Sequence, residues 1–106
     1  MLDAPNQDAA NNSSSSSKVI FENERVRVVE LRLKPGKKEP MHSHPAHLVY
    51  VLSPTRMKMT SSDGKVKEVE LKTGQVIWGE ALSHAGENVG TTELHEVIIE
   101  LKERSI

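Results

Sequence analysis

Short hydrophobic runs separated by turn residues occupy the chain from Val19 onward, and none of them has a helical period of useful length. In residues 25–33 (RVRVVELRL), Val29, Leu31 and Leu33 fall on one face of an extended chain. About eight short strands at this spacing, with turn signals between them, predict an all-β sandwich or barrel. The other predicted strands are residues 19–21, 47–52, 56–60, 66–71, 75–79, 81–89 and 93–102.

The first 18 residues (MLDAPNQDAANNSSSSSK) have almost no hydrophobic periodicity and include a run of serines from Ser13 to Ser17. Such a segment buries too little apolar surface to offset its conformational entropy. We therefore predict a disordered N-terminal tail over residues 1–18 and a single β domain over residues 19–106.

The charge balance argues against two classes of partner. The 106-residue chain has a formal net charge of -1, whereas a nucleic-acid-binding face or a membrane-surface helix needs clustered basic residues. No apolar run approaches the ~18 residues of a transmembrane helix, and the chain does not start like a signal peptide. We expect a cytoplasmic protein that binds neither nucleic acid nor membrane.

Three of the five histidines, His42, His44 and His47, lie in the segment GKKEPMHSHPAHLVYVL (residues 36–52). His42 and His44 are two residues apart, so on an extended segment both side chains point to one face and can bind one metal ion. His47 has the opposite parity. Pro45 interrupts the strand, and a bulge there would return His47 to the face of the other two histidines.

His84 lies several strands later, and the hairpin formed by residues 56–60 and 66–71 can bring it back beside residues 42–52. The chain has no cysteine, so any metal site must use nitrogen and oxygen ligands. Four neutral imidazoles suit a divalent transition metal, namely Fe, Mn, Ni, Cu or Zn, rather than Ca or Mg. The alternatives are a histidine-rich surface loop and a buried hydrogen-bonded network without metal.

These two histidine segments resemble the two motifs of the cupin superfamily. The first has Gly36, five residues, His42, one residue and His44, and the second has Gly74, five residues, Glu80, and then His84 and Asn88. The resemblance covers roughly residues 19–102. It implies a cupin-type β-barrel (a double-stranded β-helix or jelly roll) in which Asn88 is a structural turn residue.

The chain departs from the cupin pattern in three ways. His47 stands where the first motif has a glutamate, and Ser53-Pro54-Thr55 stands where that motif closes with a glycine. In the second motif, Glu80 stands where a proline is usual, and the glycine is replaced near Leu82. The resemblance implies four metal ligands, which here are His42, His44, His47 and His84. Four neutral ligands leave a divalent metal with its full charge, which favours the reduced metal and an anionic substrate.

Three further residues are candidates for catalysis. His95 alternates with Val97 and Ile99, so we expect it on the inward face of the last strand. Glu80 shares a face with Trp78 and could accept a proton if that face is inward. Tyr50 is the third titratable candidate. The alternative is that these residues stand in the core or at the rim without a role.

Two functions remain open at this stage. The first is a metal-dependent enzyme, with oxygenase-type oxidoreductase chemistry on a small carbonyl, enol or carboxylate, or else an isomerase or decarboxylase. The second is a non-catalytic module that binds a metal or a small ligand. A degenerate barrel without metal is a third interpretation, because the second motif lacks its proline and glycine. Similarity to single-domain cupins further implies a homodimer that buries one sheet or exchanges the first strand.

Overall fold

The computed structural model describes residues 16–102, which form nine β-strands. Every strand pair is antiparallel. No helix that is long and apolar enough to cross a membrane occurs among the described residues. The strands are β1 (Ser16–Glu22), β2 (Val26–Leu33), β3 (Lys38–His44), β4 (His47–Ser53), β5 (Thr55–Ser61), β6 (Val66–Leu71), β7 (Val76–Gly79), β8 (Leu82–Asn88) and β9 (Leu94–Leu101).

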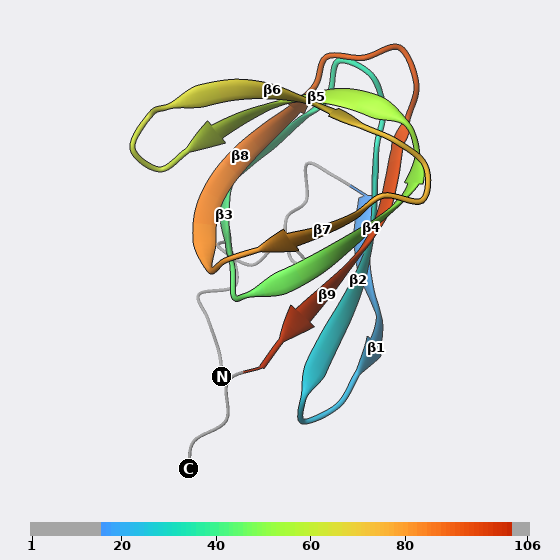
Figure 1. The fold of residues 1–106 in the computed structure, drawn as a ribbon, viewed down its shortest axis with the longest axis vertical. Helices are drawn as coiled ribbons and strands as arrows, with labels where there is room; N and C mark the ends of the chain where they lie inside the picture. Colours follow the sequence, from blue (N-terminus) through green and yellow to red (C-terminus); the bar gives the residue numbers. More distant parts are fainter. Residues whose placement is uncertain (1–15, 103–106) are drawn as a thin grey trace.

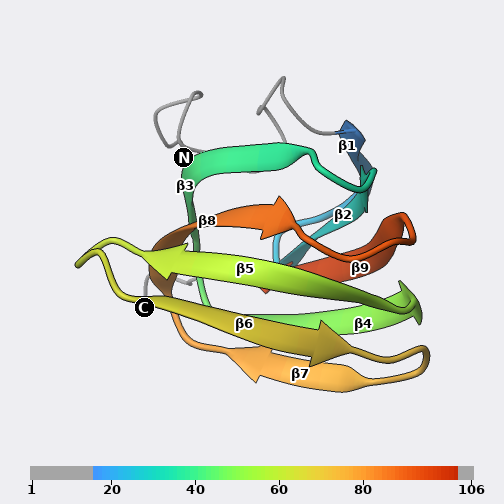
Figure 2. The same ribbon diagram turned by 90° about the horizontal axis from the view of Figure 1, so that it is seen from above.

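The strands form two sheets. The five-stranded sheet has the order β1-β2-β9-β4-β7, and the four-stranded sheet has the order β3-β8-β5-β6. Figure 1 shows β3, β8 and the β5–β6 hairpin on one side of the molecule and β1, β2, β9 and β4 on the other. In Figure 2, β3, β8, β5 and β6 follow one another across the picture. The predicted all-β barrel is therefore confirmed.

The interior is filled by the alternate residues of each strand, because successive side chains on a strand point to opposite faces. Val29, Leu31 and Leu33 of β2 are buried together, as predicted, and Val51 of β4 is fully buried beside them. The remaining buried apolar residues of this core are Met57, Leu71, Leu94 and Ile98. Met59, two residues further along the same strand as Met57, packs against this core.

The loops at one end of the barrel are joined through Asn88, whose side chain is completely buried. Its Nδ2 donates to the carbonyl oxygens of Leu33 and Thr92 at 2.8 and 2.9 Å. Its Oδ1 accepts from the Thr55 hydroxyl at 2.8 Å and from the Gly90 amide at 2.9 Å. Asn88 thus has the structural role expected for it, because one side chain satisfies polar groups from several loops.

Besides shifts of a residue or two at strand ends, two predictions differ from the structure: the extent of the N-terminal tail and the number of strands. Strand β1 begins at Ser16, where Ser16 pairs with Arg32, so residues 16–18 are part of the sheet and not of a tail. The rest of the predicted tail, residues 1–15, lies outside the described residues. Residues 38–44 form a strand of their own, β3, which the hydrophobic pattern did not reveal because only one of its seven residues, Met41, is a large hydrophobic one.

Candidate metal centre

Strand β3 carries His42 and His44, and both side chains are buried, with 1% and 5% of their surface exposed. Ser43 between them is less buried, as expected for alternate residues of a strand. The prediction that these two histidines share one face is therefore confirmed.

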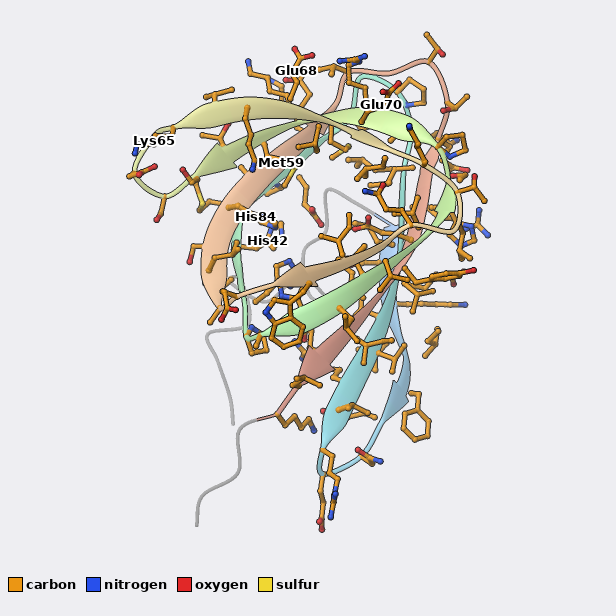
Figure 3. The ribbon with its side chains drawn as sticks, in the orientation of Figure 1. His42, Met59, Lys65, Glu68, Glu70 and His84 are labelled. Atoms are coloured by element: carbon orange, nitrogen blue, oxygen red, sulfur yellow. The ribbon has the colours of Figure 1, made fainter. Side chains whose placement is uncertain are left out.

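His84 reaches the same place from the neighbouring strand, because β8 pairs with β3 so that His84 lies directly opposite His42. The rings of His42 and His84 have centroids 4.8 Å apart, and those of His44 and His84 are 5.1 Å apart. Figure 3 shows His42 and His84 next to each other between the two sheets. Among the described residues, these three histidines form a group whose ligand atoms all lie within 4.8 Å of one another.

The hydrogen bonds of His42 and His44 determine which ring nitrogen of each histidine is available to bind a metal. His42 donates from Nδ1 to the carbonyl oxygen of Pro40 at 2.8 Å, and a carbonyl can only accept. His44 donates from Nδ1 to Oε2 of Glu100, also at 2.8 Å. In a neutral imidazole the other nitrogen, Nε2, then carries a lone pair and no proton. These two Nε2 atoms lie 3.0 Å apart.

Two lone pairs at this distance repel each other unless a proton or a cation lies between them. A metal ion bound at about 2.1 Å by two imidazole nitrogens would hold those nitrogens about 3.0 Å apart when they subtend a right angle at the metal. The donor set therefore fits a divalent transition metal, with His84 as a third nitrogen ligand.

Burial favours the neutral forms of His44 and His84. Burial, together with the nearby His44, His42 and His47 rings, lowers the pKa of His84 to about 3. Burial also lowers the pKa of His44, although the hydrogen bond to Glu100 opposes the change. Because neutral imidazole is the form that binds a metal, His44 and His84 can bind a cation at neutral pH without first losing protons.

Glu100 on β9 fixes the orientation of the His44 ring. Its side chain is almost completely buried, and its second oxygen, Oε1, accepts from Nε and from the second terminal nitrogen of Arg27 at 3.0 and 2.8 Å. Burial alone would raise the pKa of Glu100, but the hydrogen bonds from His44 and Arg27 lower it below its usual value. Glu100 is therefore a carboxylate that orients a histidine ligand, as is common around metal sites.

His47 is buried and its ring centroid is 4.8 Å from that of His44. It donates from Nδ1 to the Pro45 carbonyl oxygen at 2.7 Å. Its Nε2 faces the backbone of Gly79, where an added Cβ would lie only 2.4 Å away, and His47 is outside the group of three. Its role as a fourth ligand stays a prediction.

The route by which His47 turns inward differs from the predicted one. No bulge forms at Pro45; instead β3 ends at His44 and β4 begins at His47 in the other sheet. Pro45 and Ala46 thus form the corner between the sheets. Counting alternate residues along one strand does not predict which way His47 points, because His44 and His47 lie on strands of different sheets.

The predicted catalytic candidates Tyr50, Glu80 and His95 all lie outside the barrel. Tyr50 is 43% exposed, and Glu80 is an exposed residue that accepts a hydrogen bond from the Trp78 indole at 2.6 Å. The prediction that His95 faces inward is wrong, because β9 buries Leu94, Glu96, Ile98 and Glu100 instead. His95 is bound to Oε2 of Glu30 at 2.8 Å on the outer face.

The interior instead contains acids that sequence reasoning missed, Glu39 and Glu96 in addition to Glu100. Glu39 on β3 is 5% exposed, and Glu96 on β9 is 9% exposed. Burial and the charge of Glu39 raise the pKa of Glu96 to about 8, so Glu96 is protonated at neutral pH. Pro40 next to Glu39 was the available signal, because a proline inside a strand often marks a bulge.

Comparison with solved structures identifies the class of the fold. A cupin-domain protein from Bordetella pertussis Tohama I has a TM-score of 0.78 and 26% identity, over 87% of this chain and 97% of that one. The polyketide cyclase RemF from Streptomyces resistomycificus has a TM-score of 0.64 and 19% identity, over 94% and 72%. A predicted oxalate decarboxylase from Thermotoga maritima has a TM-score of 0.58 and 23% identity, over 81% and 79%.

No protein-family model matches the sequence, and no curated protein matches it either. The structural neighbours support the cupin superfamily, and the chain has the cupin-type double-stranded β-helix. At these identities the comparison assigns the fold and leaves the function to be argued from the site.

Proposed function

We propose that this cupin is a metal-dependent enzyme that acts on a small oxygen-bearing molecule inside the barrel. The observation that carries the proposal is the approach of the Nε2 atoms of His42 and His44 to 3.0 Å, with His84 as the third member of the group. A bound divalent metal would supply Lewis-acid polarisation of a substrate oxygen and a template for its orientation.

Residues of the chain would orient the metal ligands and exchange protons with the bound molecule. Glu100 and Arg27 hold His44 in one orientation, so the site is organised before any ligand arrives. Glu39 and Glu96 face the interior and can exchange protons with a bound molecule, a role for which Tyr50, Glu80 and His95 are placed too far outside. An interior acid beside the histidines favours an enzyme over a module that only binds.

The reaction class we favour is oxygenase-type oxidoreductase chemistry on a small carbonyl, enol or carboxylate. Imidazole ligands without thiolates suit iron or manganese, which can react with dioxygen, and they suit nickel, copper and zinc as well. His47, beside His44, is proposed as an additional ligand. Isomerisation and decarboxylation are the alternatives if the bound metal is not redox-active.

A second candidate is a non-catalytic module that binds a metal or a small ligand. It is favoured by one observation: all three of the titratable groups first considered as catalytic lie on the outer surface. Dioxygen uptake by metal-loaded protein with a panel of small enols and carboxylates separates the two. Ligand binding with neither uptake nor product would favour the module.

The deciding experiment is elemental analysis of protein purified without a metal-binding tag. We expect about one transition metal per chain in the wild type, removed by chelator and absent from His84→Ala and His44→Ala. His95→Ala is the matched control, because this histidine lies on the outer face and should leave the metal content unchanged. Folded wild-type protein that takes up no metal on titration would refute the proposal.

We also propose that the chain forms a homodimer through the outer face of the five-stranded sheet. Tyr50 on β4 lies between Val76 on β7 and Val97 on β9 in the sheet register. Tyr50, Val76 and Trp78 are 43%, 61% and 50% exposed, so their apolar surface is available to a second copy.

A further inference from the structure

We infer that Glu96 determines which molecule the barrel accepts, by donating a hydrogen bond to an uncharged carbonyl oxygen of the ligand. The inference rests on the proposed function and names a class of molecule for it. That class is a small keto acid, whose carboxylate reaches the metal and whose ketone lies farther inside, at Glu96. The evidence is the burial of Glu96, the lack of a partner for it among residues 16–102, and the acid that faces it.

Glu96 stands in an apolar wall of the barrel. It lies on the inner face of β9 between Leu94 and Ile98, which are 1% and 3% exposed, and is itself only 9% exposed. In the sheet register it pairs with Leu31 of β2 and with Val51 of β4, which are both buried. Placing a carboxyl group among such side chains costs free energy unless a hydrogen bond compensates.

No described residue supplies that hydrogen bond. Among residues 16–102, no backbone or side-chain group hydrogen-bonds the Glu96 carboxyl or forms an ion pair with it. Every completely buried side-chain nitrogen or oxygen of these residues has a hydrogen-bond partner. The Glu96 oxygens are therefore not sealed in the core but face space that water or a ligand can enter. A ligand that meets this carboxyl satisfies a polar group that the fold leaves without a partner.

Glu39 places the Glu96 carboxyl and the histidines in the same interior. A bulge in β3 turns Glu39 inward, because Glu39 pairs with Gly86 and His42 pairs with His84, so three steps along β3 match two along β8. Glu39 Oε1 lies 3.6 Å from His42 Nε2. The negative charge of Glu39 also acts on Glu96, although the two acids come from different sheets. A molecule bound at the histidines thus extends past Glu39 toward Glu96.

The protonation of Glu96 decides which group it recognises. Burial and the charge of Glu39 raise the pKa of Glu96 to about 8, so at neutral pH it is a carboxylic acid with one O–H donor. An uncharged carbonyl oxygen accepts this hydrogen bond. An anionic group would be repelled by Glu39, and an ammonium group would find no carboxylate at Glu96. The carboxylate of the keto acid belongs at the metal, whose positive charge attracts it.

The test measures the binding of keto acids to Ni(II)-loaded protein by isothermal titration. The probes are levulinate and its two longer homologues, each beside the alkanoate of equal chain length, which lacks the ketone. We expect one keto acid to bind the wild type about tenfold more tightly than its alkanoate, the effect of one hydrogen bond to a buried group. Because both ligands meet the same loaded protein, a change in metal affinity cancels from this ratio.

Two substitutions separate a hydrogen-bond donor from a charge. Glu96→Gln still offers N–H donors and should keep the ratio within about threefold, whereas Glu96→Leu matches the apolar wall and should bring the ratio to about one. Glu24→Leu is the matched control, because Glu24 is exposed in the turn between β1 and β2 and its loss should leave the ratio unchanged. Circular dichroism and urea unfolding check that each variant folds.

The outcomes also separate this inference from the proposed metal site. A ratio near one in the wild type for all three keto acids, or an unchanged ratio in Glu96→Leu, would overturn the inference. Equal losses in Glu96→Gln and Glu96→Leu would show that Glu96 acts as a carboxylate, and would overturn it too.

Wild type that takes up no Ni(II) would refute the metal site, and a measurement on metal-free protein then decides the role of Glu96. The infrared C=O band of the Glu96 acid, which Glu96→Gln lacks, should shift when the neutral ketone butanone is added. A band that does not shift would overturn the inference.

Discussion

At the scale of single residues, the site depends on which nitrogen of each histidine is held by the protein. His42, His44 and His47 all donate from Nδ1, to two backbone carbonyls and one carboxylate. Nε2 of His42 and Nε2 of His44 thus approach each other and are available to bind a metal, whereas Nε2 of His47 faces the backbone of Gly79. Two histidines anchored in this way are organised for a cation before one binds, and this reduces the entropy cost of binding.

Glu96 allows a test of the interior charge by pH. Its pKa in the folded protein is about 8, above the usual 4.5, so folding favours the protonated acid. Its contribution to stability is fully present below pH 4.5 and is lost as the pH rises through 8, because the unfolded chain ionises first. Metal-free wild type should therefore lose stability over this range, by roughly 1–3 kcal/mol more than Glu96→Gln.

Urea unfolding of both metal-free proteins at several pH values between about 4 and 9 measures this difference. Glu24→Gln is the control, because Glu24 is exposed in the turn between β1 and β2 and should keep the wild-type pH dependence. Parallel stability curves for wild type and Glu96→Gln would show that the buried acid is not neutral in the folded protein.

At the scale of elements, two irregularities build the site. The bulge at Pro40 and Met41 turns Glu39 inward, and the corner at Pro45 and Ala46 carries the chain from one sheet to the other. A third local feature is Gly79 on β7, directly opposite His47 in the register of β4 and β7. Only a residue without a side chain leaves room for the His47 ring there.

Gly79→Ala tests the role of His47 through this contact. An added Cβ would lie 2.4 Å from His47 Nε2 and 2.5 Å from Cε1, so the ring must move away. If His47 is a fourth ligand, we expect metal affinity to fall about tenfold or more, as for loss of a supporting contact. Isothermal titration with Ni(II) measures it.

The control for this variant is Gly64→Ala, because Gly64 is in the β5–β6 turn and has no atom near its added Cβ. Gly64 has a φ of 87°, so Gly64→Ala costs some stability through backbone strain but should keep the metal affinity. Unchanged affinity in a folded Gly79→Ala protein would remove His47 from the ligand set.

At the scale of the whole molecule, the two sheets have different outer faces. The four-stranded sheet carries charged residues outward on β6, among them Glu68 and Glu70, which Figure 3 shows at the edge of the molecule. The five-stranded sheet exposes Tyr50, Val76 and Trp78. This asymmetry favours self-association through the five-stranded sheet.

Tyr50→Lys should turn the proposed dimer into a monomer, because a second copy would bring two lysines into one apolar interface. Light scattering coupled to gel filtration measures the mass. Val66→Lys is the control: Val66 is 53% exposed but belongs to the other sheet. A wild-type monomer at about 100 μM would contradict the homodimer.

The sequence alone determined the features that depend on local periodicity. Alternation placed Val29, Leu31 and Leu33 in the core, and spacing placed His42 and His44 on one face. Turn residues separated the strands and agreed with the all-β fold, because turn chemistry and side-chain alternation act over a few residues.

Only the tertiary structure decided which face of a strand with two partly apolar sides is buried. On β9, the neighbouring strands β2 and β4 set the register, so Glu96 lies beside Leu31 and Val51 inside the barrel and His95 lies outside. The bulge before His42 and the corner after His44 likewise depend on pairing with distant strands. A shift of one residue reverses every side chain of a strand, and the contacts that set this shift are far apart in the chain.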